Sequence, residues 1–285
     1  MEYAILCLVA LTNMVQNIFK QKYTDRNPGG VCFFSGMTAL FAMLFFLAVN
    51  RDFDYSRALL LPSFGFAVSY AVATVFAVLA IRCGSLAKTT LILSCSLLLP
   101  TFYGIICLKE PVHATMIAGV LLLLVSLVLV HYEKEKSAQK VTFRWVLYVL
   151  LAFLGNGMCS IVQKAKQLCL GEAGNNMFMI VALGVVVVLL FAFSMASGTE
   201  RQAFHGFGWK GWLLALLCGI ANGATNYFVI FLNSRLPASV MFPIISAGGM
   251  ILIFLYSVFV RKEKFSLRQK VGFLLGTASI VLLNL

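Results

Sequence analysis

The sequence predicts an all-α integral membrane protein in which ten transmembrane helices form two inverted five-helix repeats. Three observations lead to this fold class. Hydrophobic residues make up 61% of the chain and charged residues 11%, whereas about a quarter of an average soluble domain is charged. Apolar runs long enough to cross a bilayer fill nearly all of the 285 residues. A passage at the end of the fourth run returns at the end of the ninth, which indicates an internal repeat.

Each apolar run predicts one helix, because only helices and closed barrels satisfy the backbone in hydrocarbon and barrel strands are about half as long. The first run lacks a basic leading segment, so we expect it to be kept as a helix and not cleaved as a signal. In chain order, we expect the ten helices at about 2–22, 30–50, 61–82, 85–108, 112–132, 143–166, 175–197, 208–234, 236–260 and 266–284.

The repeated passage contains LKEPVHATMIAG, which begins at Leu108, and VRKEKFSLRQKVG, which begins at Val260. In both copies a glycine follows the glutamate by nine residues, and a serine follows that glycine by seven. At a shared offset of 153 residues, Lys109, Glu110, Gly119 and Ser126 correspond to Lys262, Glu263, Gly272 and Ser279. Two further pairs of passages match at offsets of 143 and 150 residues: NMVQNIFKQK with NGMCSIVQKAK, and GSLAKTTLI with SRLPASVMF.

The repeat divides the chain at HYEKEKSAQK, the longest polar segment in its middle. We expect residues 1–132 to form the first five-helix repeat, residues 133–141 a linker loop of cytoplasmic type, and residues 142–285 the second repeat. Because each half contains an odd number of helices, the second half enters the membrane from the opposite side, and the two halves are inverted. Inverted repeats are typical of secondary transporters, whose site lies near the membrane midplane between the halves.

This organisation resembles the drug/metabolite transporter superfamily, in its EamA type. The resemblance covers the whole chain and rests on two five-helix halves, each with a glutamate between its last two helices and a glycine nine residues later. It implies a ten-helix carrier for a small metabolite, such as an amino acid, a nucleotide sugar or choline, and it leaves the substrate open.

Two arguments disagree on the orientation of the bundle. The odd-numbered connections hold 16 of the 22 Lys and Arg residues, so the positive-inside rule favours both termini outside; the family resemblance implies both termini inside. The net charge of +12 comes from Lys and Arg residues that orient the helices and contact the anionic lipid bilayer. We therefore expect no nucleic-acid partner. We expect a monomer that crosses the bacterial inner membrane several times.

Polar stripes along the first helix of each half are the main candidate site. Asn13 and Asn17 share one helix face in the first run, and Asn156, Ser160 and Gln163 share one in the sixth. The eighth run has a second stripe, because helical spacing places Asn222, Asn226 and Asn233 on one face. Polar groups in lipid usually face a bundle interior or a wet cavity; hydrogen bonding between helices, worth about 0.6 kcal/mol, is the alternative. The complete set of expected substrate-binding residues is Asn13, Asn17, Tyr70, Thr74, Ser94, Asn156, Ser160, Asn222, Asn226, Pro243 and Ser246.

Other residues inside or near the runs allow more than one interpretation. Pro243 removes a backbone donor, so it either frees a carbonyl for a ligand or produces a packing kink. Lys20 and Lys164 lie near helix ends, where we expect them to extend to the interface instead of contacting a ligand. Gly219 and Gly223 predict close helix packing within one chain.

The distribution of chemically reactive side chains argues against catalysis. All ten acids lie at helix ends or in connections, where Glu110 and Glu263 are expected to complement the N-terminal dipole of the helix that each precedes. Without a central carboxylate, uniport or exchange is favoured, and proton-coupled efflux of drugs or metabolites is the alternative. The eight cysteines and three histidines form no ligand pattern, so we expect no metal and no cofactor. A lipid-modifying intramembrane enzyme is a remote alternative, and a structural scaffold leaves the amide stripes unexplained.

Overall fold

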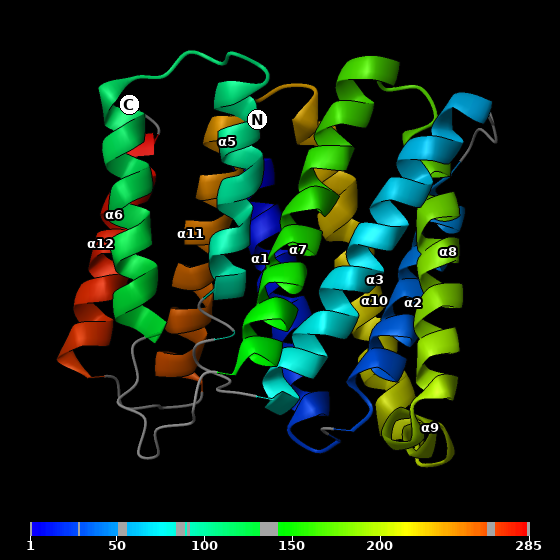
Figure 1. Cartoon of the computed structure of the whole chain (residues 1–285). Helices are drawn as coiled ribbons and strands as arrows, with labels where there is room; N and C mark the ends of the chain where they lie inside the picture. The colour runs from blue at the N-terminus through cyan, green and yellow to red at the C-terminus, as the bar shows by residue number, and fades with distance from the viewer. Residues whose placement is uncertain are drawn as a thin grey trace.

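The structure is a computed structural model that describes residues 2–27, 29–50, 56–83, 89, 92–131, 142–260 and 266–283. The ordered elements within these ranges are helices (Figure 1). The expected linker at 133–141 and the second copy of the Lys-Glu pair, at 262–263, lie outside the described residues.

The helices follow the apolar runs closely. They are α1 (Glu2–Thr24), α2 (Val31–Val49), η1 (Arg57–Leu59), α3 (Leu60–Cys83), η2 (Cys95–Leu97), α5 (Leu98–Ile106), α6 (Ala114–His131), α7 (Phe143–Leu170), α8 (Asn175–Ala196), α9 (Gly198–His205), α10 (Trp209–Asn233), α11 (Ala238–Phe259) and α12 (Leu267–Leu283). Two features differ from expectation: the fourth run is interrupted by the 3-10 turn η2, and the short polar helix α9 was not predicted.

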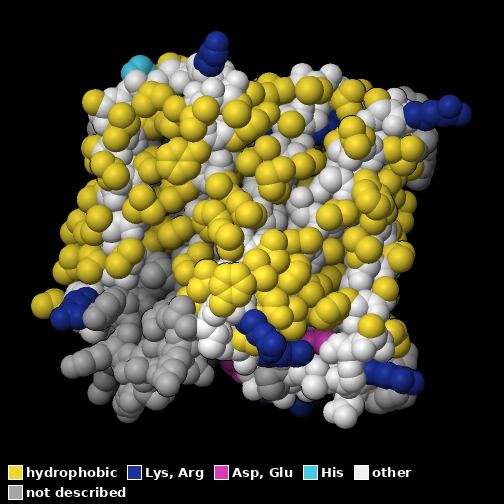
Figure 2. Space-filling model, viewed as in Figure 1, with side chains coloured by type: hydrophobic (Ala, Val, Ile, Leu, Met, Phe, Trp, Pro, Cys, Tyr) yellow, Lys and Arg dark blue, Asp and Glu magenta, His cyan; other side chains and the backbone are white. Residues whose placement is uncertain are grey.

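Within the described ranges, seven helices are long and apolar enough to cross a membrane: α1, α2, α3 with η1, α7, α8, α10 and α11. Ile92–Ile106 and Ala114–Val130 are apolar but shorter, and α12 has 17 residues. Figure 2 shows hydrophobic side chains across the middle of one face and Lys or Arg side chains toward its ends. This distribution suits a bilayer, and the prediction of an all-helical membrane protein is confirmed for the described residues.

Helices from the two halves of the chain interleave in one bundle. α3 packs along α7 and α8, α1 packs along α10 and α11, and α2 packs against both α8 and α10. At one edge of the bundle α6 and α12 lie side by side (Figure 1). The two halves therefore share a common core.

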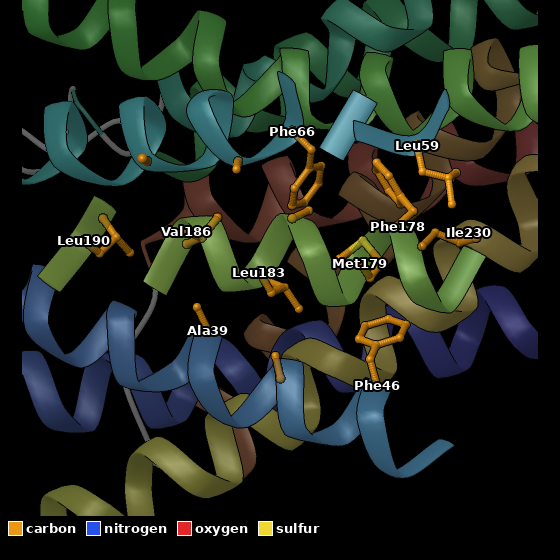
Figure 3. Close-up of a cluster of buried hydrophobic side chains, with 14 residues drawn as sticks. Ala39, Phe46, Leu59, Phe66, Phe178, Met179, Leu183, Val186, Leu190 and Ile230 are labelled. Carbon is orange, nitrogen blue, oxygen red and sulfur yellow. The ribbon is translucent and has the colours of Figure 1, made fainter. Parts of the chain in front are cut away.

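The largest part of this core surrounds α8 (Figure 3). Phe178, Leu183 and Val186 of α8 are fully buried, between Phe46 of α2 and Phe66 of α3. Lipid tails are as apolar as leucine, so close packing holds these helices together in a membrane, with little help from the hydrophobic effect. The complementarity of these side chains therefore fixes how the halves fit together.

Glycines allow the closest helix approaches. A Cβ at Gly223 of α10 would lie 2.6 Å from Cδ1 of Phe45 on α2, and Gly219 lies against Phe41 of the same helix. At Gly155 of α7, a Cβ would lie 2.8 Å from a backbone carbonyl oxygen of α3. The predicted close packing at Gly219 and Gly223 is confirmed as a contact within the chain.

Candidate functional site

A network of side-chain amides joins α7 and α10 inside the bundle. Gln163 Nε2 on α7 donates to Asn226 Oδ1 on α10 at 2.9 Å. Asn226 Nδ2 donates to the carbonyl oxygen of Asn222 at 2.9 Å and lies 3.3 Å from its Oδ1. Gln163 and Asn222 are buried, and Asn226 is half-buried. The polar stripes predicted on these two helices therefore meet in one hydrogen-bonded group.

Polar side chains also join α1 to α10. Thr225 Oγ1 donates to Thr12 Oγ1 at 2.8 Å. One turn further along α1, Asn17 Nδ2 donates to Asn13 Oδ1 at 2.8 Å; Asn13 is half-buried and Asn17 is exposed. The helix α10 is thus polar toward α1 and toward α7, which are the first helices of the two halves.

Asn156 connects α7 to the first half of the chain. Its Nδ2 donates to Ser96 Oγ of η2 at 2.6 Å. The neighbouring Gly157 permits this approach, because a Cβ there would lie 2.9 Å from the carbonyl oxygen of Ser96. Asn156 is exposed although it lies in the middle of an apolar helix. A polar group in that position usually faces a wet cavity or the bundle interior.

The other expected residues lie on the helices around this network. Tyr70 packs beside Phe66 in the core, with ring centroids 6.1 Å apart. Helix α11 continues through Pro243, which is buried. The remaining members are half-buried: Thr74, Ser94, Ser160 and Ser246. Their contact with a substrate stays a prediction.

Lys164 does not extend to the interface, which corrects the expectation from its place near a helix end. Its side chain is 4% exposed, and Nζ donates to the carbonyl oxygens of Asn233 at 2.9 Å and Leu236 at 2.7 Å. The last carbonyls of a helix have no donor within it, and a cation complements the dipole at that end. Lys164 therefore stabilises the end of α10.

Glu110 does not complement the helix that follows it, so that prediction is wrong. Its Oε1 accepts from the backbone N–H of Ala238 at 2.9 Å, and its Oε2 accepts from that of Ser239 at 2.8 Å. These are the first N–H groups of α11. Gly104 leaves room for the carboxylate, because a Cβ there would lie 2.9 Å from the carboxyl carbon. A carboxylate from the first half thus caps a helix of the second half.

A second carboxylate of this kind lies at the opposite end of the bundle, where Figure 1 shows α9. Glu200 Oε2 accepts from the backbone N–H groups of Cys32 at 3.0 Å and Phe33 at 3.1 Å, at the start of α2. Its Oε1 forms an ion pair with Arg82 at 2.6 Å. Burial raises the pKa of the Glu200 carboxyl, whereas the two N–H groups and Arg82 lower it. Sequence reasoning missed this pair, because no local pattern links residues this far apart.

The inner network offers neutral donors and acceptors, which bind polar groups through hydrogen bonds. Ion-paired and helix-capping charges lie instead at the two ends of the bundle. Among the described residues, no group of three or more His, Cys, Asp or Glu side chains could hold a metal ion. The arrangement is suited to binding a polar molecule inside an apolar bundle.

Comparison with known proteins gives a family match and a similar fold. Residues 143–285 match the model of the EamA-like transporter family. A solved structure titled "Crystal structure of protein" has a TM-score of 0.74 and 14% sequence identity, and the match covers 97% of this chain and 98% of that chain. At this identity, the likeness shows the fold alone. A search of curated proteins gave no significant match.

Proposed function

The chain belongs to the EamA-like transporter family, and from this premise we propose that it is a secondary transporter of a small polar or zwitterionic metabolite, amino acid-like or choline-like. The substrate moves by alternating access between two inverted repeats, as uniport or exchange. The observation that carries the proposal is the amide network of Gln163, Asn222 and Asn226. Polar groups are costly in lipid and mark substrate pathways in membrane proteins.

The packing of the helices supports ten membrane crossings in two inverted repeats. In two repeats, α1, α2, α3, α5 and α6 correspond in order to α7, α8, α10, α11 and α12. A contact between two helices should then recur between their counterparts. The pair α3–α7 has the counterpart α10–α1, and both pairs are in contact. The pair α2–α10 has the counterpart α8–α3, and these contacts are present too. Helices α6 and α12 are antiparallel, because Gly272 near the start of α12 lies against Val130 at the end of α6. Inversion requires antiparallel partners of this kind.

The two capping carboxylates support alternating access. Glu110 connects the first half to α11 at one end, and Glu200 connects the second half to α2 at the other. When the halves rock against each other around a central site, contacts between them must break at one end while those at the other end are kept. Each carboxylate is therefore placed to close one side of the pathway.

Replacing Asn13 or Asn226 by alanine is expected to reduce transport at least tenfold while the protein still folds. Each substitution removes an amide that is half-buried among apolar helices. Uptake in proteoliposomes and thermal melting of the purified protein measure the two effects. Gln202→Ala, at an exposed amide of α9, is the matched control and should transport normally. If both variants transport normally, the substrate does not bind at these two amides, and the proposed site is wrong.

Transport is expected to persist without a pH gradient and to show counterflow from preloaded vesicles. The inner network consists of amides and hydroxyls, which do not titrate near pH 7, and both carboxylate oxygens of Glu110 are held by backbone N–H groups. Reconstituted protein with a trial substrate tests this. Strict dependence on a proton gradient, abolished in Glu110→Gln or in Glu263→Gln, would favour the alternative, proton-coupled efflux.

A further inference from the structure

A pocket of about 530 Å³ opens where α7 and α10 end and α11 begins. It lies at the end of the bundle that Glu110 and Lys164 close, and it is separate from the amide network. The groups that could contact a ligand there are Lys164, Gln167, Glu172, Asn233 and Arg235, with an apolar wall that includes Leu236.

Two amides that line the pocket are buried without a complete set of partners. Asn233 is 2% exposed, and neither its Oδ1 nor its Nδ2 has a hydrogen-bond partner in the described part of the chain. Gln167 is 6% exposed, and its Oε1 also lacks one. Buried polar atoms are nearly always hydrogen-bonded, because leaving them unpaired costs free energy. Both residues line the pocket, so a ligand can satisfy these three unpaired atoms once the two side chains turn toward it.

The pocket also contains charges of both signs. Lys164 Nζ uses two of its three N–H groups on the carbonyl oxygens of Asn233, the last residue of α10, and of Leu236 in the connection that follows, so one is left for a ligand. The guanidinium of Arg235 stacks over the ring of Phe231, 3.7 Å from its centroid, which restricts its orientation. Glu172 is exposed at the mouth. Glu110 contributes little directly, since both of its oxygens are bound to α11.

We propose that this pocket is a second binding site, which takes a small zwitterion with a carboxylate and an ammonium group. Lys164, Arg235 and Asn233 Nδ2 bind the carboxylate; Glu172 and Gln167 Oε1 bind the ammonium. The pocket is a first stop for the substrate at one mouth of the pathway. That role rests on the proposed transport function, whereas the binding itself does not.

The full chain in phosphatidylcholine nanodiscs, titrated with the neutral L-amino acids, tests the proposal. At least one of them should bind, and its two analogues without the ammonium or without the carboxylate should each bind at least tenfold more weakly. If no neutral amino acid binds, or if an analogue with only one charge binds equally well, the proposal is wrong.

Two substitutions locate the site. Asn233→Ala and Gln167→Ala should each weaken binding at least tenfold, while the melting temperature without ligand stays the same or rises, because an unpaired buried group is removed. A merely structural role would lower the melting temperature. Binding unchanged in both variants would also overturn the proposal.

A third substitution separates the pocket from the transport site. Asn226→Ala should keep the pocket affinity while losing transport. If the protein binds an amino acid but transports nothing, the proposed pocket site stands and the proposed transport function is refuted. If it transports a substrate but binds no amino acid, the transport function stands and the pocket proposal is refuted.

Discussion

Arg82→Met is expected to lower the free energy of unfolding by about 3 kcal/mol, the largest effect of a single substitution that we expect. It leaves the carboxylate of Glu200, which is 0% exposed, without its cation. Removing one partner of a buried pair costs about 3–5 kcal/mol, and the lower end applies because Arg82 is 31% exposed. Thermal melting of the purified protein measures the loss. Arg57→Met, at an exposed arginine, is the matched control and should change little.

The pH dependence identifies the cause of this loss. Burial already places the pKa of Glu200 above its ordinary value, and removing Arg82 raises it further. A group whose pKa is raised on folding favours the folded state below its unfolded pKa, and this contribution is lost as the pH rises through the folded value. The gap between variant and wild type should therefore narrow as the pH falls. Adding Glu200→Gln should restore part of the stability; no recovery would mean that the ion pair is not the cause.

Glu110→Ala is expected to lower the free energy of unfolding by about 2–3 kcal/mol, because two charge-assisted hydrogen bonds to the start of α11 disappear. Hydrogen exchange should increase at Ala238 and Ser239 more than elsewhere in α11. Glu172→Ala removes an exposed carboxylate at the same end of the bundle and should leave this exchange unchanged. Equal protection of Ala238 and Ser239 in both variants would contradict the capping role.

The length and continuity of the apolar runs were sufficient to predict the helices. For example, the expected run at 30–50 is α2, and that at 175–197 is α8. The helix α9 was missed because its eight residues are mostly polar and too few to show an apolar periodicity. The interruption of the fourth run at η2 has a signal that the run length hid: Pro100 has no N–H to donate to the carbonyl oxygen of Ser96, four residues earlier, which lies in η2. The family resemblance that rests on the repeated glutamate and glycine is confirmed by the match over 143–285.

Helical spacing predicted which polar residues share a face of one helix, but not which residues of different helices meet in the candidate site. Spacing placed Asn222 and Asn226 on one face of α10, and the structure joins them. It could not show that Gln163 meets Asn226, because that contact depends on how α7 and α10 cross. The position of Lys164 was misjudged for the same reason. Its place near a helix end suggested contact with water, whereas its Nζ donates to carbonyl oxygens at the end of α10 and in the connection after it.

The distance in sequence between Glu200 and the helix that it caps has a consequence for biosynthesis. The backbone N–H group of Cys32 donates to the carboxylate of Glu200, which is synthesised 168 residues later. At about 5–20 residues per second of translation, roughly 10–30 s pass between the synthesis of these two residues. During that interval the nascent first half holds the start of α2 without its final partner. The ribosome must therefore extend the second half as far as α9 before the start of α2 can reach its mature form, and a fragment that stops short of α9 would stay immature.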